Sequence, residues 1–247
     1  MIAALPMYDR PETAAANDRL WQGVRAGLGY GPETLTRDGD FWDIWQSPDL
    51  LIAQTCGYPF RARLHHQVQL VGTPVLALPD TPPGHYHSAL VIRADDPREA
   101  PQDFATAPFA YNEALSQSGW AAPQNWAAAR GFHFSNPVKT GAHRASAMAV
   151  SEGRADIAAI DALTWNILHT HDRFTDNLRV LDRTEPTPAL PYITAQANDP
   201  APLFDALQTA IAGLSQDDRT TLGITGLIRL PATDYLAVPN PPPPPPN

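Results

Sequence analysis

Short apolar runs alternate with segments of helical periodicity along most of this chain. PDLLIAQT at 48–55 is continuously apolar, as expected for a strand buried on both faces, and QLVGTPVLAL at 69–78 and SALVIR at 88–93 are similar. DPAPLFDALQTAIAGL at 199–214 instead has apolar residues three and four apart, the spacing of an amphipathic helix. This alternation predicts an α/β architecture with mostly parallel sheets.

The length and composition leave the number of domains open but exclude several classes of protein. A chain of 247 residues can form one large α/β unit or two compact lobes, and 43% hydrophobic content is ample for a core. The net charge of −9 and the lack of any Lys/Arg run argue against nucleic-acid binding. No apolar run approaches the roughly 20 residues that a membrane-spanning helix needs.

Neither the cysteine content nor the N-terminus fixes the compartment. Cys56 is the only cysteine, so no intramolecular disulfide can form. The N-terminal MIAALPMYDRP has no basic segment and is too short for a signal peptide, and it is typical of a first strand. The chain is therefore expected to be cytoplasmic unless a leader precedes it.

Three junctions share one arrangement, in which an apolar strand is followed by a short polar turn with a glycine and then by a helix. A helix N-terminus exposes unpaired N–H groups and a partial positive charge, so it binds phosphate, sulfate or carboxylate well. The junctions contain Thr55, Gly57 and Tyr58 at the first, Ser116, Ser118 and Gly119 at the second, and Thr140, Gly141 and His143 at the third.

Helix capping is the alternative explanation of these junctions. Ser and Thr are ordinary N-caps, and one such junction alone favours capping. Three junctions that each carry a glycine favour a ligand. Because a protein of net charge −9 does not attract anions at long range, local N–H groups and hydroxyls must supply the binding.

The residues at these junctions also resemble a known family. AQTCGYPF, GHYHSALVIR, AYNEALSQSG and KTGAHRASAMAVSEGRADIAAID occur in this order. Together they resemble the phosphate/phosphonate-type substrate-binding proteins of ABC transporters, over residues 2 to about 235. The resemblance implies a non-catalytic protein with the two-lobed type II periplasmic-binding-protein fold.

In that fold two α/β lobes are joined by two crossover strands and close on a ligand. Carried over to this chain, lobe 1 is expected at 1–90 and 191–239, and lobe 2 at 91–190. SALVIR and LPYIT are the expected crossover strands. The ligand would lie in the cleft between the lobes, and closure would exclude water and strengthen its hydrogen bonds.

The resemblance implies which residues bind the ligand, a small oxyanion such as phosphate or a phosphonate. The anion-binding Ser-x-Ser segment of the family matches Ser116 and Ser118, with Gly119 after it. The other implied ligand contacts are Tyr8, Thr55, Tyr58, Tyr86, His143 and Asp161. Structural alternatives stay open for several of these, since Tyr86 could pack at a hinge, His143 could cap a helix and Tyr8 could belong to a simple turn.

An enzyme on the same fold is the alternative function. Ser118, His143 and Asp161 could form a Ser/His/Asp set, although no G-x-S-x-G motif is present. Cys56 could pair with a histidine as a nucleophile, or it could be a small packed residue. A binding protein without catalysis is the favoured interpretation.

We expect no metal and no cofactor. His85 with His87, and His169 with His171, are pairs with no third ligand at a suitable spacing. The carboxylates of TRDGDFWDIW lack the glutamate that completes a calcium loop.

The partners expected from the resemblance are a small anion and an ABC permease, with the protein itself a monomer. The resemblance favours the periplasm. The C-terminal NPPPPPPN at 240–247 can form neither helix nor sheet, and we expect an extended, disordered tail, with binding to an aromatic-lined groove as the alternative.

Overall fold

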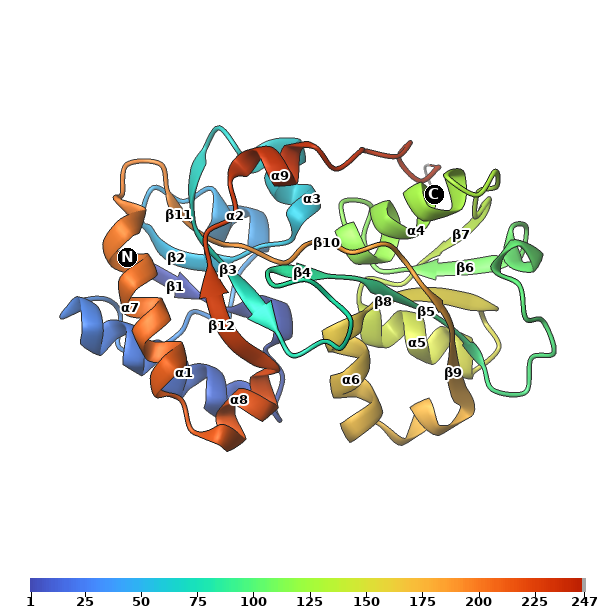
Figure 1. Cartoon of the computed structure of the whole chain (residues 1–247), viewed down its shortest axis with the longest axis horizontal. Coiled ribbons are helices and arrows are strands. Elements are labelled where there is room, and N and C mark those ends of the chain that lie inside the picture. Colours follow the sequence, from blue (N-terminus) through green and yellow to red (C-terminus); the bar gives the residue numbers. More distant parts are fainter. Residues whose placement is uncertain (246–247) are drawn as a thin grey trace. The chain divides into compact units, whose positions relative to one another are not determined.

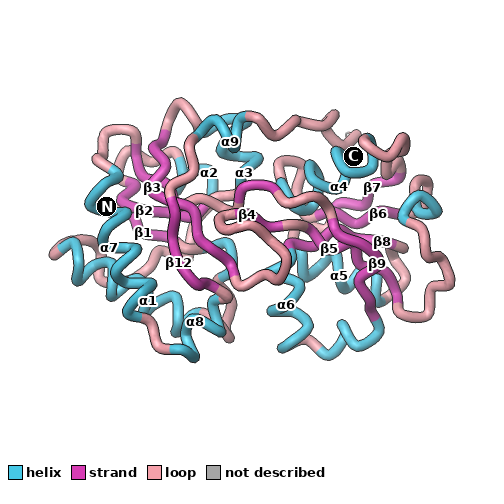
Figure 2. The backbone as a smooth tube through the Cα atoms, viewed as in Figure 1, coloured by secondary structure: helices cyan, strands magenta, loops and turns pink. Residues whose placement is uncertain are grey.

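The structure is a computed structural model, and it describes residues 1–245. The chain forms two compact units, one of Met1–His85 with Pro188–Ala237 and the other of Tyr86–Thr187 with residues 238–245 (Figures 1 and 2). The chain therefore changes unit after residues 85, 187 and 237, in each case a few residues before the boundary expected from the sequence.

The first unit is built on a five-stranded sheet of order β1-β2-β11-β3-β12. β1 and β2 are parallel, whereas β11 is antiparallel to β2 and β3, and β12 is antiparallel to β3. The strands are β1 (Ile2–Ala4), β2 (Leu50–Gln54), β3 (Val68–Leu76), β11 (Tyr192–Ala195) and β12 (Ile224–Ile228).

Two long helices, α1 and α7, pack closely against each other on one face of this sheet (Figure 1). A Cβ atom added at Gly23 of α1 would lie 3.0 Å from the Cβ of Ala210, and one at Gly27 would lie 3.2 Å from that of Ala206. Small residues on both helices thus allow the close approach. The helices of this unit are α1 (Ala14–Leu28), α2 (Phe41–Trp45), α3 (Gly57–Pro59), α7 (Pro200–Gly213), α8 (Gln216–Leu222) and α9 (Ala232–Leu236), with a 3-10 helix at Pro6–Tyr8 and a π-helix at Phe60–Leu64.

The second unit has its own five-stranded sheet, of order β7-β6-β8-β5-β9. β6 is parallel to both of its neighbours, and β5 is antiparallel to β8 and β9. The strands are β5 (Ser88–Arg93), β6 (Pro108–Tyr111), β7 (Asn136–Lys139), β8 (Ile157–Asp161) and β9 (Leu178–Arg183).

Aliphatic and aromatic side chains cover different parts of this second sheet. Alanine-rich α5 packs on β5, β6 and β8 through a cluster that includes Ala147 and Val150. The ring centroids of Trp120 and of Tyr111, at the end of β6, lie 5.0 Å apart. The helical segments are the π-helix Gln117–Ala121, α4 (Ala122–Ala128), α5 (His143–Ser151), α6 (Ala162–His171) and the 3-10 helices Pro101–Phe104 and Arg173–Asn177.

The predicted strands and helices are confirmed, but the prediction of mostly parallel sheets is wrong. In the two five-stranded sheets only β1–β2, β6–β7 and β6–β8 are parallel. The strands β5 and β11 enter their sheets antiparallel to a neighbour, because each follows directly on a change of unit rather than on a crossover helix. The apolar periodicity of a strand does not indicate whether it runs parallel or antiparallel to its neighbours.

The two segments expected to be crossover strands do not change unit. SALVIR is β5 and lies wholly in the second unit, and LPYIT leads into β11 of the first unit. The changes of unit occur within β4 (His85–Tyr86) and β10 (Thr187–Pro188), which form a two-stranded sheet of their own. Short polar and proline-containing strands of this kind carry little hydrophobic signal, so the sequence pattern favours the longer apolar strands next to them.

The C-terminal segment differs from the expected disordered tail in its described part. Trp120 Nε1 donates to the carbonyl of Pro242 at 3.0 Å, and Asn125 Nδ2 donates to that of Pro239 at 2.8 Å. Pro241 between them is buried. Carbonyls of an extended proline segment are free to accept such bonds, because proline has no N–H with which to form a sheet. Residues 246–247 of the tail lie outside the described residues.

Candidate functional site

The sheet of the second unit brings the second and third sequence junctions together. Because β6 is parallel to β7 and β8, the carboxyl ends of all three strands meet at one edge. Ser116–Gly119 follow β6, Thr140–His143 follow β7, and Asp161 is the last residue of β8. In α/β sheets this edge is the usual position of a ligand site.

The second junction is a tight turn in which Ser116 holds Gly119 in place by a hydrogen bond. Ser116 is the N-cap of the π-helix, and its Oγ accepts from the Gly119 N–H at 3.0 Å. A Cβ atom at Gly119 would lie 1.9 Å from Oδ1 of Asn112, far inside van der Waals contact. Capping therefore does explain Ser116, and a larger residue than glycine at position 119 would force the Asn112 side chain to move.

Ser118 lies at the centre of the polar contacts at this edge. Its Oγ is 2.8 Å from Nε2 of His143, and its carbonyl accepts from Oγ of Ser88 at 2.9 Å. The Ser118 N–H makes no hydrogen bond among residues 1–245. Ser118 is only 3% exposed, so its N–H and hydroxyl are held in a fixed position.

His143 is the first residue of α5 and is held as a neutral imidazole. Its Nδ1 is buried and has no hydrogen-bond partner in the described part of the chain. Burial lowers the pKa of His143 to about 4, and the nearby carbonyl of Ala159 opposes the shift by favouring the charged ring. The residue as a whole keeps some exposure, but the ring nitrogen does not.

The other polar residues at this edge mainly order the turns. Asp161 caps α6, with Oδ1 accepting from the Thr164 N–H at 2.9 Å, and is 2% exposed. Thr140 Oγ1 lies 2.6 Å from Oγ of Ser146 and 3.0 Å from the carbonyl of Tyr111. The hydrogen bonds of Thr140 therefore hold the turn at the third junction together. His143 is the residue of this junction that contacts Ser118.

Two polar residues at this edge were missed by sequence reasoning. Ser88, the first residue of β5, pairs in register with Asp161 and bonds to Ser118. The Oδ1 atom of Asn112 is buried and has no hydrogen-bond partner among the described residues. A polar residue directly after an apolar strand was the available signal for Asn112, whereas Ser88 reads as part of an apolar run.

Tyr86 belongs to the second unit and is 1% exposed on β4. Such burial fits either a packing role or a ligand contact, and it stays a predicted site residue.

The first unit brings its own predicted residues to one edge of its sheet. β1 and β2 are parallel, so Tyr8 and the turn containing Thr55 and Tyr58 follow strands that end at the same edge. Thr55 is fully buried, and its Oγ1 has no hydrogen-bond partner among residues 1–245. Tyr58 is 6% exposed, and the guanidinium of Arg61 lies 4.3 Å from its ring centroid.

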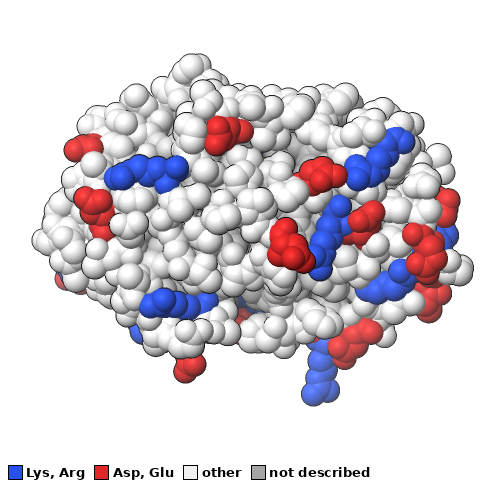
Figure 3. All heavy atoms as spheres, in the orientation of Figure 1, with Lys and Arg blue, Asp and Glu red and all other residues white. Residues whose placement is uncertain are grey.

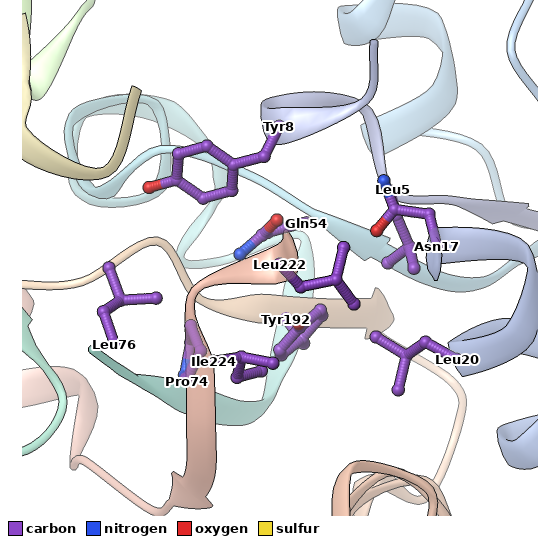
Figure 4. Close-up of a pocket in the computed structure, with 10 residues that line it drawn as sticks. All are labelled: Leu5, Tyr8, Asn17, Leu20, Gln54, Pro74, Leu76, Tyr192, Leu222 and Ile224. Carbon is purple, nitrogen blue, oxygen red and sulfur yellow. The ribbon is translucent and has the colours of Figure 1, made fainter. Parts of the chain in front are cut away.

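A small cavity of about 20 Å³ lies at this edge of the first unit (Figure 4). Tyr8 and Gln54 line it together with apolar residues, and Nε2 of Gln54 donates to the Leu190 carbonyl at 3.2 Å. Burial raises the pKa of Tyr192, which also lines the cavity, so this phenol stays protonated. The full lining is Leu5, Tyr8, Asn17, Leu20, Gln54, Pro74, Leu76, Tyr192, Leu222 and Ile224.

The described residues form neither a triad nor a metal site. Ser118 and His143 are adjacent, but Nδ1 of His143 has no partner and Asp161 bonds to Thr164, so the third member of a Ser/His/Asp set is missing from residues 1–245. Cys56 is half-buried directly before α3. Within the same residues no three His, Cys, Asp or Glu side chains group as metal ligands.

The face that Figure 3 shows carries no basic patch, and the described helices include no candidate membrane span. On the face that Figure 3 shows, Lys and Arg side chains are interspersed with Asp and Glu. None of the helices within residues 1–245 is both long enough and apolar enough to cross a membrane.

Comparison with known proteins assigns a family to this arrangement. Residues 48–235 match the family described as "ABC transporter, phosphonate, periplasmic substrate-binding protein". The chain belongs to this family. No curated protein matches the sequence.

Solved structures with the same fold include members of this periplasmic phosphonate-binding family. PhnD1 from Prochlorococcus marinus, in complex with methylphosphonate, superposes with a TM-score of 0.75 at 12% identity, covering 95% of this chain and 94% of that one. A binding protein component of an ABC phosphonate transporter from Pseudomonas aeruginosa gives 0.66 at 14%, covering 92% and 80%. XAC2383 from Xanthomonas citri, bound to ATP, gives 0.67 at 15%, covering 95% and 92%.

Family membership confirms several predictions. The fold is that of the periplasmic binding proteins, and the family consists of periplasmic, non-catalytic substrate-binding proteins, so the enzyme alternative is not supported. Such proteins bind a small molecule and work with a permease. The identity of the ligand and the residues that contact it stay predictions.

Proposed function

We propose that this periplasmic phosphonate-binding family member binds a small oxyanion, a phosphonate or phosphate, at the turn formed by Ser116, Ser118 and Gly119. The observation that carries the proposal is Ser118, whose N–H makes no hydrogen bond in the described chain and whose hydroxyl is held by His143. A fixed N–H and O–H pair at a helix start is a suitable donor set for an oxyanion.

The edge of the first unit supplies the remaining contacts in this proposal. Thr55 offers a buried hydroxyl without a partner among residues 1–245, and Tyr8 and Tyr58 follow the same pair of strands. A buried hydroxyl left without a hydrogen bond is costly, and a bound ligand oxygen would remove that cost. Tyr86 and Asp161 would contact the non-anionic part of the ligand.

In this proposal the protein acts as a monomer. It binds its ligand and delivers it to an ABC permease. Hinged closure on a ligand is the usual motion of two-unit binding proteins.

Isothermal titration with methylphosphonate, phosphate and sulfate tests the site. Ser118→Ala removes one donor to the anion, so we expect affinity to fall by about 1–3 kcal/mol. Ser135→Ala is the matched control, because Ser135 is an exposed serine of the same unit and should bind as the wild type does. Unchanged affinity in the Ser118 variant would remove this turn from the site, and failure of the wild type to bind any of the three anions would contradict the proposed function.

A further inference from the structure

The Ser118 hydroxyl has one proton and two neighbours that compete for it. Its Oγ lies 2.8 Å from Nε2 of His143. If Nε2 is unprotonated, the hydroxyl donates to the ring and turns only lone pairs toward a ligand, which repel an anion. If Nε2 carries a proton, the ring donates to Oγ and the hydroxyl is free to donate to the anion.

Burial favours an imidazole ring with a single proton. Nδ1 is buried, has no partner among residues 1–245, and the pKa of the ring is held at about 4 by burial. At neutral pH the imidazole thus has one proton to share between two nitrogens, and only one of the two tautomers prepares Ser118 to donate.

Three of the charged side chains on α5 and the surrounding elements are held in ion pairs or in a helix cap. Lys139 pairs with Glu113 at 3.0 Å, Arg144 pairs with Asp172 at 2.8 Å, and Asp161 caps α6. Burial and the Ala159 carbonyl are the causes of the shifted pKa of His143, and no charged side chain contributes to it. The other titratable groups on elements packed against α5 are Tyr111 on β6, Arg93 on β5, and Arg173 and Asp176 on the following 3-10 helix.

An anion at Ser118 would therefore be the strongest charge near this ring. It would lie two hydrogen bonds from Nε2, in a setting where burial keeps water from screening the interaction. The charged ring also gains from the Ala159 carbonyl, which favours a protonated imidazole.

We propose that an oxyanion bound at Ser118 draws one proton from solvent onto His143, so that ligand binding and proton uptake are coupled. The charged ring then donates from Nε2 to Ser118, and Ser118 donates to the anion. The proton returns to solvent when the ligand leaves. This inference rests on the proposed function, because it requires the anion to sit at Ser118.

The direction of the pH dependence follows from linkage. The bound state holds the proton more tightly than the free state, so affinity rises as pH falls from the higher, bound pKa toward the free value of about 4. A neutral ring with its proton on Nε2 could also donate to Ser118. If that tautomer were the one that binds the anion, His143 would take up no proton on binding.

Proton uptake can be measured by titrating methylphosphonate into the protein in two buffers of different ionisation enthalpy at pH 6. His143→Gln is the test variant, because its amide can still donate to Ser118 but cannot titrate. We expect the wild type to take up about half to one proton more than the variant, and its affinity to rise by up to about tenfold more between pH 7.5 and 6. Comparing the two proteins cancels the titration of the ligand itself.

Equal proton uptake in the wild type and the glutamine variant would overturn the proposal. His133→Asn, at an exposed histidine of the same unit, should match the wild type. If His143→Gln does not fold, the ring nitrogen shifts of ¹⁵N-histidine-labelled wild type decide instead: His143 should become doubly protonated at pH 6 when methylphosphonate is added, and a ring that stays neutral contradicts the coupling. Binding of none of methylphosphonate, phosphate and sulfate removes the proposed function and this inference together, whereas binding without proton uptake removes the inference alone.

Discussion

At the scale of single residues, the turn at the second junction combines a structural role and a proposed functional role in two neighbouring serines. Ser116 is a helix cap, and its bond to the Gly119 N–H shapes the turn in which Ser118 is presented. The sequence predicted these residues as one group but could not separate the residue that caps from the residue that is proposed to bind. Their spacing is the same in both cases, and only the direction of each side chain distinguishes them.

Gly119→Ala should damage this turn, because the new Cβ would collide with Oδ1 of Asn112 at 1.9 Å. We expect a loss of about 1–3 kcal/mol in the free energy of unfolding, as is usual for overpacking, together with loss of methylphosphonate binding. Gly213→Ala, where a Cβ would meet no atom within 4 Å, is the control and should lower neither the stability nor the binding. Urea denaturation and isothermal titration measure the two quantities, and a fully stable, binding-competent Gly119→Ala protein would contradict the role given to this glycine.

At the scale of elements, the described C-terminal segment is part of the second unit. It accepts hydrogen bonds from Trp120, directly after the Ser116–Gly119 turn, and from Asn125 of α4. The composition of the tail predicted an extended conformation, but the choice between a free end and an aromatic contact depended on whether a partner side chain lay within reach. Tertiary structure supplies that partner.

A chain that ends at Ala237 should therefore be less stable than the full chain. Loss of the two hydrogen bonds is expected to cost about 1–2 kcal/mol, and the Trp120 indole N–H should exchange faster with solvent. A chain that ends at Pro245 keeps both acceptors and is the control. Urea denaturation and hydrogen exchange of the indole N–H test this, and equal stability of the two truncated chains would show that the contact does not hold the segment in solution.

At the scale of the whole molecule, the pH dependence of stability should carry the signature of His143. Its pKa is about 4 in the folded protein and 6.5 as the ordinary value, so the unfolded chain binds the proton first as pH falls. The stability from the neutral ring is complete above pH 6.5 and is lost progressively between 6.5 and about 4.

In the absence of ligand, the wild type should lose up to about 3 kcal/mol more of its unfolding free energy between pH 7 and 4 than His143→Gln does. The pKa of His87 is also lowered by burial, so some dependence should remain in the variant. His133→Asn should follow the wild type. Urea denaturation at several pH values measures the difference, and identical profiles for the wild type and His143→Gln would show that His143 is not held neutral.

Apolar periodicity and local turn chemistry are properties of neighbouring residues, so the sequence alone predicts the strands, the helices and the position of the polar turns along the chain. The resemblance of its sequence blocks also predicts the family. Tertiary structure decided which strands are antiparallel, where the chain changes unit, and that Ser118 meets His143 across 25 residues and Ser88 across 30. These outcomes depend on contacts between distant segments, where packing and burial select among arrangements that the local sequence allows equally. For the same reason the neutral state of His143 follows from its burial in the folded chain and from nothing in the residues beside it.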